Sequence, residues 1–150
     1  MAATPKPIDP RAPRFNQAVV ATLLLVAFVA NWPLLVPALA TVLLAGALFG
    51  PRFAPFLALY VTLIKPRLGP PTELEDPRPP LFAATIGALV LFGATTAFLA
   101  GNIDLGWILA LAVAVLAGLA ATTGICVGCE IYLAAARRRG VSVPRPAPPP

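Results

Sequence analysis

The sequence predicts an all-α membrane protein with four transmembrane helices arranged as two hairpins. Hydrophobic residues make up 59% of the 150-residue chain and charged residues only 11%, whereas a soluble domain has about 45–50% and about 25%. The apolar residues gather in runs that approach the roughly 20 residues needed to cross a bilayer. All eleven Lys and Arg residues lie outside these runs, on one side of the predicted membrane. This positive-inside pattern places the protein in a cell membrane with both termini in the cytoplasm.

The basic residues give a formal net charge of +5 and a pI of about 10.0. They do not indicate a nucleic-acid partner, because they flank the apolar runs and form no basic stripe interleaved with aromatic residues. We expect them to hold the cytoplasmic loops against anionic headgroups. The lipid bilayer is therefore the first partner that the sequence predicts.

The chain begins with a proline-rich cytoplasmic arm over residues 1–14, followed by a first helix over residues 15–30. Four prolines in the arm oppose regular helix: Pro5, Pro7, Pro10 and Pro13. Asn16 is placed to cap the first amides of the helix. No small-x-small cleavage site precedes Asn31, so we expect this apolar run to be retained as a transmembrane helix.

A second helix is predicted over residues 33–49. The tripeptide Asn31-Trp32-Pro33 precedes it and reverses the chain. A tryptophan suits the headgroup zone of a membrane, and a proline suits the first turn of a helix. Gly50-Pro51 then ends the helix.

Residues 51–65 are apolar but too short to cross a bilayer. Their larger apolar side chains recur at helical spacing on one face, namely Phe53, Phe56, Leu57, Tyr60 and Ile64. We expect a short interfacial helix on the cytoplasmic surface, with an extension of the bundle core as the alternative. Residues 66–80 follow as a charged, proline-rich loop, which either covers the cytoplasmic end near the cysteines or is a solvated connector.

The second hairpin comprises helices over residues 81–100 and 105–136, which complete a single transmembrane domain over residues 15–136. The last helix would be roughly 45 Å long, against a hydrocarbon core of about 30 Å. It therefore either protrudes into the cytoplasm or breaks, and a break is expected near Gly124. Residues 137–150 are a basic, proline-rich tail that we expect to be disordered. We identify no residue-level repeat between the two halves.

Cys126-Val127-Gly128-Cys129-Glu130 is the cluster of reactive side chains in the apolar portion. On one helix Cys126, Cys129 and Glu130 would share a face, while Gly124 and Gly128 would form a small-xxx-small packing surface nearly opposite. A C-x-x-C pair at a helix start favours a thiolate, because the helix dipole and free amides stabilise it. A break at Gly124 would give that arrangement. The alternative is that both cysteines are small, buried packing residues.

Glu130 has two interpretations. It is either a proton acceptor for Cys126 or an interfacial residue that pairs with Arg137 or Arg138. No metal site is expected, because two thiols are too few for a closed zinc site and the chain has no histidine. A homodimer would be needed to supply four thiolates.

Four segments carry a resemblance to a known family. They are residues 8–16, residues 50–55, the loop from Glu73 to Phe82, and Gly124-Ile125-Cys126-Val127-Gly128-Cys129. Together they resemble domain of unknown function 4395, a family of bacterial membrane proteins with a Gly-x-Cys-x-Gly-Cys signature. The resemblance implies a small inner-membrane protein whose relatives often occur beside thioredoxin-like and rhodanese-like proteins. It implies no activity, and Ile125-Cys126-Val127 departs mildly from the Phe-Cys-Leu that the family often has.

Two functions are consistent with these features. In the first, Cys126 attacks and Cys129 resolves, so that the pair transfers electrons or sulfur. Electrons would pass between a thioredoxin-like partner and another acceptor, with quinone as a candidate cofactor. In the sulfur version, the thiols would guide or carry a sulfur compound across the bilayer, and a rhodanese-like protein is a candidate partner. In the second, the chain is a non-catalytic accessory or assembly subunit of a larger membrane complex or homo-oligomer, and Gly124 and Gly128 are its packing surface. A transporter acting alone is disfavoured because the first three helices nearly lack charged residues.

Overall fold

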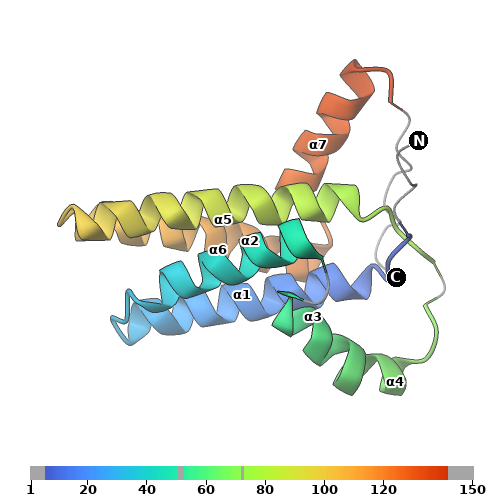
Figure 1. Ribbon diagram of the computed structural model, residues 1–150, viewed down its shortest axis with the longest axis horizontal. Helices are drawn as coiled ribbons and strands as arrows, with labels where there is room; N and C mark the ends of the chain where they lie inside the picture. Colours follow the sequence, from blue (N-terminus) through green and yellow to red (C-terminus); the bar gives the residue numbers. More distant parts are fainter. Residues whose placement is uncertain (1–5, 51–52, 72, 142–150) are drawn as a thin grey trace.

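Four long helices run side by side and form the body of the molecule (Figure 1). They are α1 (Arg11–Val29), α2 (Leu35–Phe49), α5 (Arg78–Leu99) and α6 (Ile103–Thr123). The computed structural model describes residues 6–50, 53–71 and 73–141. Over these residues every named element is helical, and an isolated antiparallel bridge joins Ile8 to Glu75. The predicted all-α class is confirmed for this part of the chain.

Shorter helices flank the bundle. The first flanking helix is α3 (Pro55–Leu59), which continues through the π-helical turn η2 (Tyr60–Ile64) into α4 (Lys65–Leu68). The second flanking helix is α7 (Val127–Arg138). The two leave the same end of the bundle in opposite directions (Figure 1).

The bundle is held together mainly by contacts between the two hairpins. α1 packs chiefly against α6, α2 against α5, and α5 also against α6. The fully buried positions are mostly alanine, which lets helix backbones approach closely: Leu24, Ala27, Val36, Ala40, Ala88, Leu91 and Ala94.

The outer surface of the bundle is apolar, as lipid contact requires. α1, α5 and α6 are long and apolar enough to cross a membrane, whereas the apolar α2 has only 15 residues. Large hydrophobic side chains point outward, with Val29 and Leu99 each 84% exposed. Contiguous apolar surface of this extent is rare on a soluble monomer. The structure is therefore compatible with a membrane protein, and the fourth crossing, through α2, remains a prediction.

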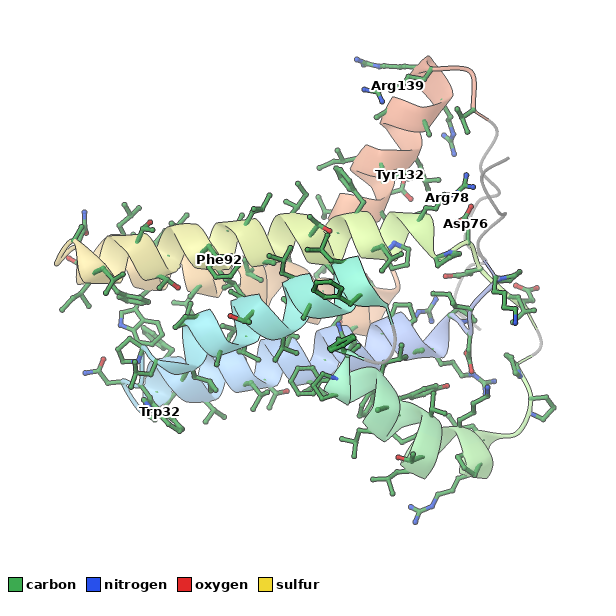
Figure 2. All side chains as sticks on the ribbon, viewed as in Figure 1. Trp32, Asp76, Arg78, Phe92, Tyr132 and Arg139 are labelled. Atoms are coloured by element: carbon green, nitrogen blue, oxygen red, sulfur yellow. The ribbon has the colours of Figure 1, made fainter. Side chains whose placement is uncertain are left out.

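The two ends of the bundle differ in charge. One end holds the turns that join α1 to α2 and α5 to α6, and Trp32 lies there, 54% exposed (Figure 2). The other end, here called the basic end, is where α1 and α5 begin and α2 and α6 finish. Every described Lys and Arg belongs to segments at the basic end, including Arg78 beside Asp76 and Arg139 at the tip of α7 (Figure 2).

Two helices begin earlier than predicted. α1 starts at Arg11 rather than at residue 15, so Asn16 lies inside the helix and does not cap it. α5 starts at Arg78 rather than at residue 81. Pro13 of the arm and Pro79 of the loop lie in the first turns of these helices, where a missing N–H costs nothing. Pro10 is the N-cap residue of α1, Pro7 precedes the helix, and Pro5 lies outside the described residues. The arm expected over residues 1–14 thus contributes its last residues to α1, and its residues 1–5 lie outside the described residues.

The predicted helix over residues 105–136 is divided in two, because α6 ends at Thr123 and α7 begins at Val127. Of the alternatives considered, protrusion and a break near Gly124, the structure has the break. The tail expected over residues 137–150 contributes its first two residues to α7. Its residues 142–150 lie outside the described part, as do residues 51–52 of the interfacial segment and residue 72 of the loop.

The hairpins share a repeated signature that the sequence analysis missed. Asp9 and Asp76 each open the pattern Asp-Pro-Arg-x-Pro-x-Phe. In both copies the aspartate carboxylate accepts a hydrogen bond of 2.9 Å from the backbone N–H of the arginine. The residues just before the two aspartates, Ile8 and Glu75, pair with each other through reciprocal backbone hydrogen bonds of 2.9 Å. Equivalent positions therefore meet, as they do across a two-fold axis.

The repeat extends to the flanking helices. The phenylalanine of each signature packs against a tyrosine of the flanking helix, with ring centroids 5.7 Å apart for Phe15 and Tyr60 and 5.6 Å apart for Phe82 and Tyr132. The second helix of each hairpin also ends at a glycine with positive φ, Gly50 and Gly124. Each half is thus a long helix, a turn, a second helix, a break and a flanking helix.

The first flanking helix is fixed to the arm by a buried hydrogen bond. Tyr60, 2% exposed, donates its hydroxyl to the buried carboxylate of Asp9 at 2.9 Å. Burial, and then the hydrogen bond to Asp9, raise the pKa of Tyr60 to about 12, so this donor keeps its proton at physiological pH. Around this anchor, other large side chains of the segment stay exposed, such as Leu59 and Leu63.

Candidate functional site

The candidate site lies where α6 ends and α7 begins, at the basic end. Gly124 closes α6 in the left-handed conformation, with φ of +73°, and its N–H donates to the carbonyl of Ala120. A side chain there would be strained, so glycine permits the sharp exit from the helix. Cys126 then adopts an extended conformation and becomes the N-cap of α7.

The sulfur of Cys126 accepts hydrogen bonds at this helix start. The backbone N–H of Cys129 donates to Cys126 Sγ at 3.3 Å. Gln17 of α1, 109 residues away in sequence, donates its side-chain Nε2–H to the same sulfur at 3.5 Å. Both cysteines are free thiols; Cys126 is partly buried and Cys129 is buried. The pair therefore combines one accessible, hydrogen-bonded sulfur with one enclosed sulfur.

The two thiols differ in acidity. A hydrogen bond from the Cys129 side chain, followed by those from the Cys129 N–H and from Gln17, outweighs partial burial and lowers the pKa of Cys126 to about 7. That same hydrogen bond to Cys126, then burial, then the charges of Cys126 and Glu75, raise the pKa of Cys129 above its ordinary value. Near neutral pH the pair thus holds a substantial fraction of thiolate on Cys126 and a protonated Cys129. This division suits an attacking and a resolving cysteine.

The two glycines of the predicted packing surface do not share a helix face. The guanidinium of Arg14 lies over Gly124, with Nη2 2.9 Å from the position that a Cβ would occupy. Gly128 instead faces Ala83 of α5, whose Cβ lies 2.7 Å from the corresponding position. The prediction of one common face is wrong, because the break at Gly124 interrupts the helical phase. Gly128 nonetheless lets α7 approach α5 closely.

Glu130 lies on α7 but is exposed. Among the described residues it forms no salt bridge with Arg137 or Arg138, which lie exposed in the last turn of α7. The carboxylate whose charge acts on the pair is Glu75, in the loop before α5. The bridge to Ile8 holds the backbone of Glu75 at the basic end. The loop over residues 66–80 thus brings one of its acids near the cysteines.

Sequence reasoning missed Gln17 as a site residue. A polar side chain inside an otherwise apolar membrane helix was the available signal. Arg14 and Glu75 were noted only as members of charged groups. Which carboxylate or guanidinium meets the cysteines depends on helix packing, which spacing along the chain does not encode.

The described residues offer no group of three or more His, Cys, Asp and Glu side chains that could hold a metal ion. A shallow groove of about 230 Å³ on α1 is lined by Ala18, Val19, Thr22 and Leu23. Its one hydroxyl, on Thr22, already donates to the carbonyl of Ala18. The lining of the groove is therefore almost entirely apolar.

Comparison with known proteins gives one family. A family model described as "Domain of unknown function (DUF4395)" matches residues 8–137, which include both hairpins, both signatures and the cysteine pair. No curated protein and no solved structure matches the chain.

Proposed function

The chain belongs to the DUF4395 family, and because that description carries no activity, we propose a function from the site itself: Cys126 and Cys129 perform thiol–disulfide exchange or sulfur transfer at the cytoplasmic side of a cell membrane. The observation that carries this proposal is the placement of Cys126 Sγ at the N-cap of α7, where the Cys129 N–H and Gln17 both donate to it. A sulfur so placed is stabilised as the nucleophilic thiolate.

The membrane arrangement is part of the proposal. α1, α2, α5 and α6 cross the bilayer, and the basic end faces the cytoplasm, where the positive-inside rule places Lys and Arg. The flanking helices lie in the interface, with exposed apolar residues such as Leu63 and Ile131 toward lipid. α2 supports a fourth crossing because it packs antiparallel along the spanning α5. This topology places the cysteine pair near the cytoplasmic headgroups, where resting thiols are reduced.

In the exchange, the Cys126 thiolate attacks one sulfur of a substrate disulfide. The S–S bond breaks, the first substrate thiolate leaves with the bonding electrons, and a mixed disulfide remains at Cys126. Cys129 then loses its proton to water and attacks Cys126 Sγ, which expels the second substrate thiolate and forms the Cys126–Cys129 disulfide. The substrate gains two electrons, and a cytoplasmic dithiol protein of the thioredoxin-like class restores the thiols by the same steps in reverse.

The sulfur-transfer version uses the same nucleophile. The Cys126 thiolate attacks the outer sulfur of a sulfane-sulfur donor, such as the persulfide of a rhodanese-like protein. The donor leaves as a thiolate with the S–S electrons, and Cys126 becomes a persulfide. A second thiol then accepts that sulfur and returns Cys126 to the thiolate.

A trapping experiment tests the proposal. The purified Cys129→Ser variant should accumulate a mixed disulfide or persulfide at Cys126 after incubation with a small disulfide or an inorganic polysulfide, as read by mass spectrometry of the intact protein. The Cys126→Ser variant should accumulate far less, because its remaining thiol is buried and protonated. Equal trapping in the two variants, or a double Cys→Ser strain with the full activity of the natural protein, would remove the thiol function.

The role of Glu75 has its own control. Glu75→Gln should shorten the lifetime of the mixed disulfide at Cys126, because the charge of Glu75 raises the pKa of Cys129 and its removal eases ionisation of that thiol. Glu130→Gln removes the same charge from the exposed side of α7 and should leave that lifetime unchanged. A shorter lifetime in Glu130→Gln alone would assign the effect to Glu130.

The accessory-subunit alternative loses its predicted packing surface. Gly124 is covered by Arg14 and Gly128 by Ala83, both from the same chain. The two glycines are therefore used in the fold and do not support docking of another subunit.

A further inference from the structure

Arg14 stands out because its guanidinium lies over Gly124, two residues before the reactive Cys126. It belongs to the first turns of α1, three residues before Gln17, which donates to Cys126. Its guanidinium covers Gly124, with Nη2 at 2.9 Å and Cζ at 3.2 Å from the position of an absent Cβ. Gly124 precedes Cys126 by two residues, so α1 presents a cation and an amide donor to one short segment.

The charge of Arg14 is not neutralised by the described carboxylates. Its guanidinium, with five N–H donors, forms no hydrogen bond and no ion pair with any residue in the described ranges. Two aspartates at the basic end bind other groups. Asp9 accepts hydrogen bonds from Tyr60 and the Arg11 N–H, and Asp76 accepts from the N–H of Arg78 and pairs with its side chain. A partly buried cation without a protein anion is suited to an anionic ligand.

Comparing the two copies of the internal repeat distinguishes the residues that build the helix start from those that occur only beside the cysteines. The signature Asp-Pro-Arg-x-Pro-x-Phe builds the helix start in both halves. Arg14 occupies one of the variable (x) positions of that signature, and the residue at this position in the second copy is Leu81. One turn further along, the counterpart of Gln17 is Ala84. The helix start therefore forms with apolar residues at both positions, and the polar pair occurs only in the copy that faces the thiols.

We propose that Arg14 forms an anion-binding subsite beside Cys126, and that the substrate of Cys126 carries a negative charge close to its reactive sulfur. This inference rests on the proposed thiol function and names its substrate class: small disulfides or sulfane-sulfur compounds that bear a carboxylate or an oxoanion group. A guanidinium binds such groups in bidentate fashion. It also stabilises the negative charge that develops on the sulfur leaving group when Cys126 attacks.

The test compares two alkylating probes that differ in charge. Iodoacetate is an anion and iodoacetamide is neutral, and both react with the thiolate, so their rate ratio cancels the ionisation of Cys126. The reduced, full-length protein in detergent is treated with each probe, and modification of Cys126 is followed by mass spectrometry. In Arg14→Gln the ratio of iodoacetate to iodoacetamide rates should fall by roughly threefold to tenfold, the effect of one charge a few ångströms away in a partly aqueous setting.

Arg67→Gln is the matched control, because it removes the same charge from α4 of the first flanking helix. Its ratio should equal that of the natural protein, whereas an equal fall in both variants would show a diffuse field and overturn the subsite. Arg14→Lys should keep most of the ratio. If Arg14→Gln does not fold, the natural protein provides the test, with the uncharged N-acetylcysteine amide as the reference thiol. The rate ratio of the protein should exceed that of the reference and decline with added salt. A ratio equal to that of the reference overturns the proposal.

Failure of the subsite and failure of the function are distinguishable. If Cys126 reacts readily with iodoacetamide while Arg14→Gln leaves the ratio unchanged, the anion subsite is wrong and the thiol function stands. If Cys126 of the folded natural protein is inert to both probes, the thiol function fails and the subsite with it.

Discussion

Replacing Cys129 by alanine should make Cys126 a weaker acid and a slower nucleophile at neutral pH. The pKa of Cys126 falls from its ordinary 9.0 to about 7, and the hydrogen bond from the Cys129 side chain is the largest cause. At pH 7 a thiol with a pKa of about 7 is about half ionised, against about 1% for a pKa of 9, which is roughly a 50-fold gain in thiolate. Because the pKa is lower by two units, the intrinsic nucleophilicity of that thiolate is reduced by about eightfold. The net advantage is about sixfold.

The assay is the rate at which a small neutral disulfide reacts with Cys126, measured from pH 5 to pH 10. The natural protein should show a midpoint near pH 7, and Cys129→Ala should shift it upward. Cys129→Ser is the matched control, because its hydroxyl still donates to Cys126, and its midpoint should lie between the other two. A midpoint near 9 in the natural protein, or one indifferent to Cys129→Ala, would refute the hydrogen-bond account of the site.

Three further outcomes follow from the packing and the titration. Tyr60→Phe removes one hydrogen bond from the buried carboxylate of Asp9 and should lower the free energy of unfolding by about 1–3 kcal/mol, measured by denaturant titration in detergent. Tyr132→Phe should lower the free energy of unfolding by less, because the Tyr132 hydroxyl forms no hydrogen bond with a described residue. Gly128→Ala should push α7 away from α5, lower the thermal unfolding midpoint and reduce the free energy of unfolding by about 1–3 kcal/mol. Gly118→Ala is the control and should change the midpoint less, because the added Cβ would meet only an ordinary contact at 3.8 Å. The reduced protein should gain stability as pH rises from about 7 toward 9, because the Cys126 pKa is lowered by folding, and should lose stability above 9, because the Cys129 pKa is raised.

The sequence was sufficient for the class of the fold but not for its boundaries. The apolar runs and the positions of Lys and Arg are visible in short stretches of sequence, so they predict the fold class without knowledge of helix packing. The starts of α1 and α5 differ from the predicted ones because proline opposes helix in the interior but is tolerated in the first turn. The sequence alone does not decide the break after α6, since a glycine in an apolar run is compatible with both a continuous and an interrupted helix.

Only those residues of the candidate site that are close neighbours in the sequence were predicted together. Cys126 and Cys129 are three residues apart, so their spacing alone suggested a pair. Gln17 reaches the same sulfur across 109 residues, and Glu75 comes from a loop whose path depends on the bridge to Ile8. Such contacts are set by how α1 packs on α6 and α5 on α7, and hydrophobic periodicity does not specify those pairings.

The repeat explains why the chemistry sits where it does. Both halves solve the same structural problem, that of starting a membrane helix with an aspartate, a proline and an arginine and anchoring a flanking helix through a Phe–Tyr contact. Because these shared residues secure the fold twice, the positions that differ between the halves are free to serve another purpose. The differences include Arg14, Gln17 and Cys126, and the structure gathers these three at a single helix break. Gln17, which has no polar counterpart in the other half, thus reaches the sulfur of Cys126 across 109 residues, and this difference between the halves supports the proposed thiol function over a purely structural cysteine pair.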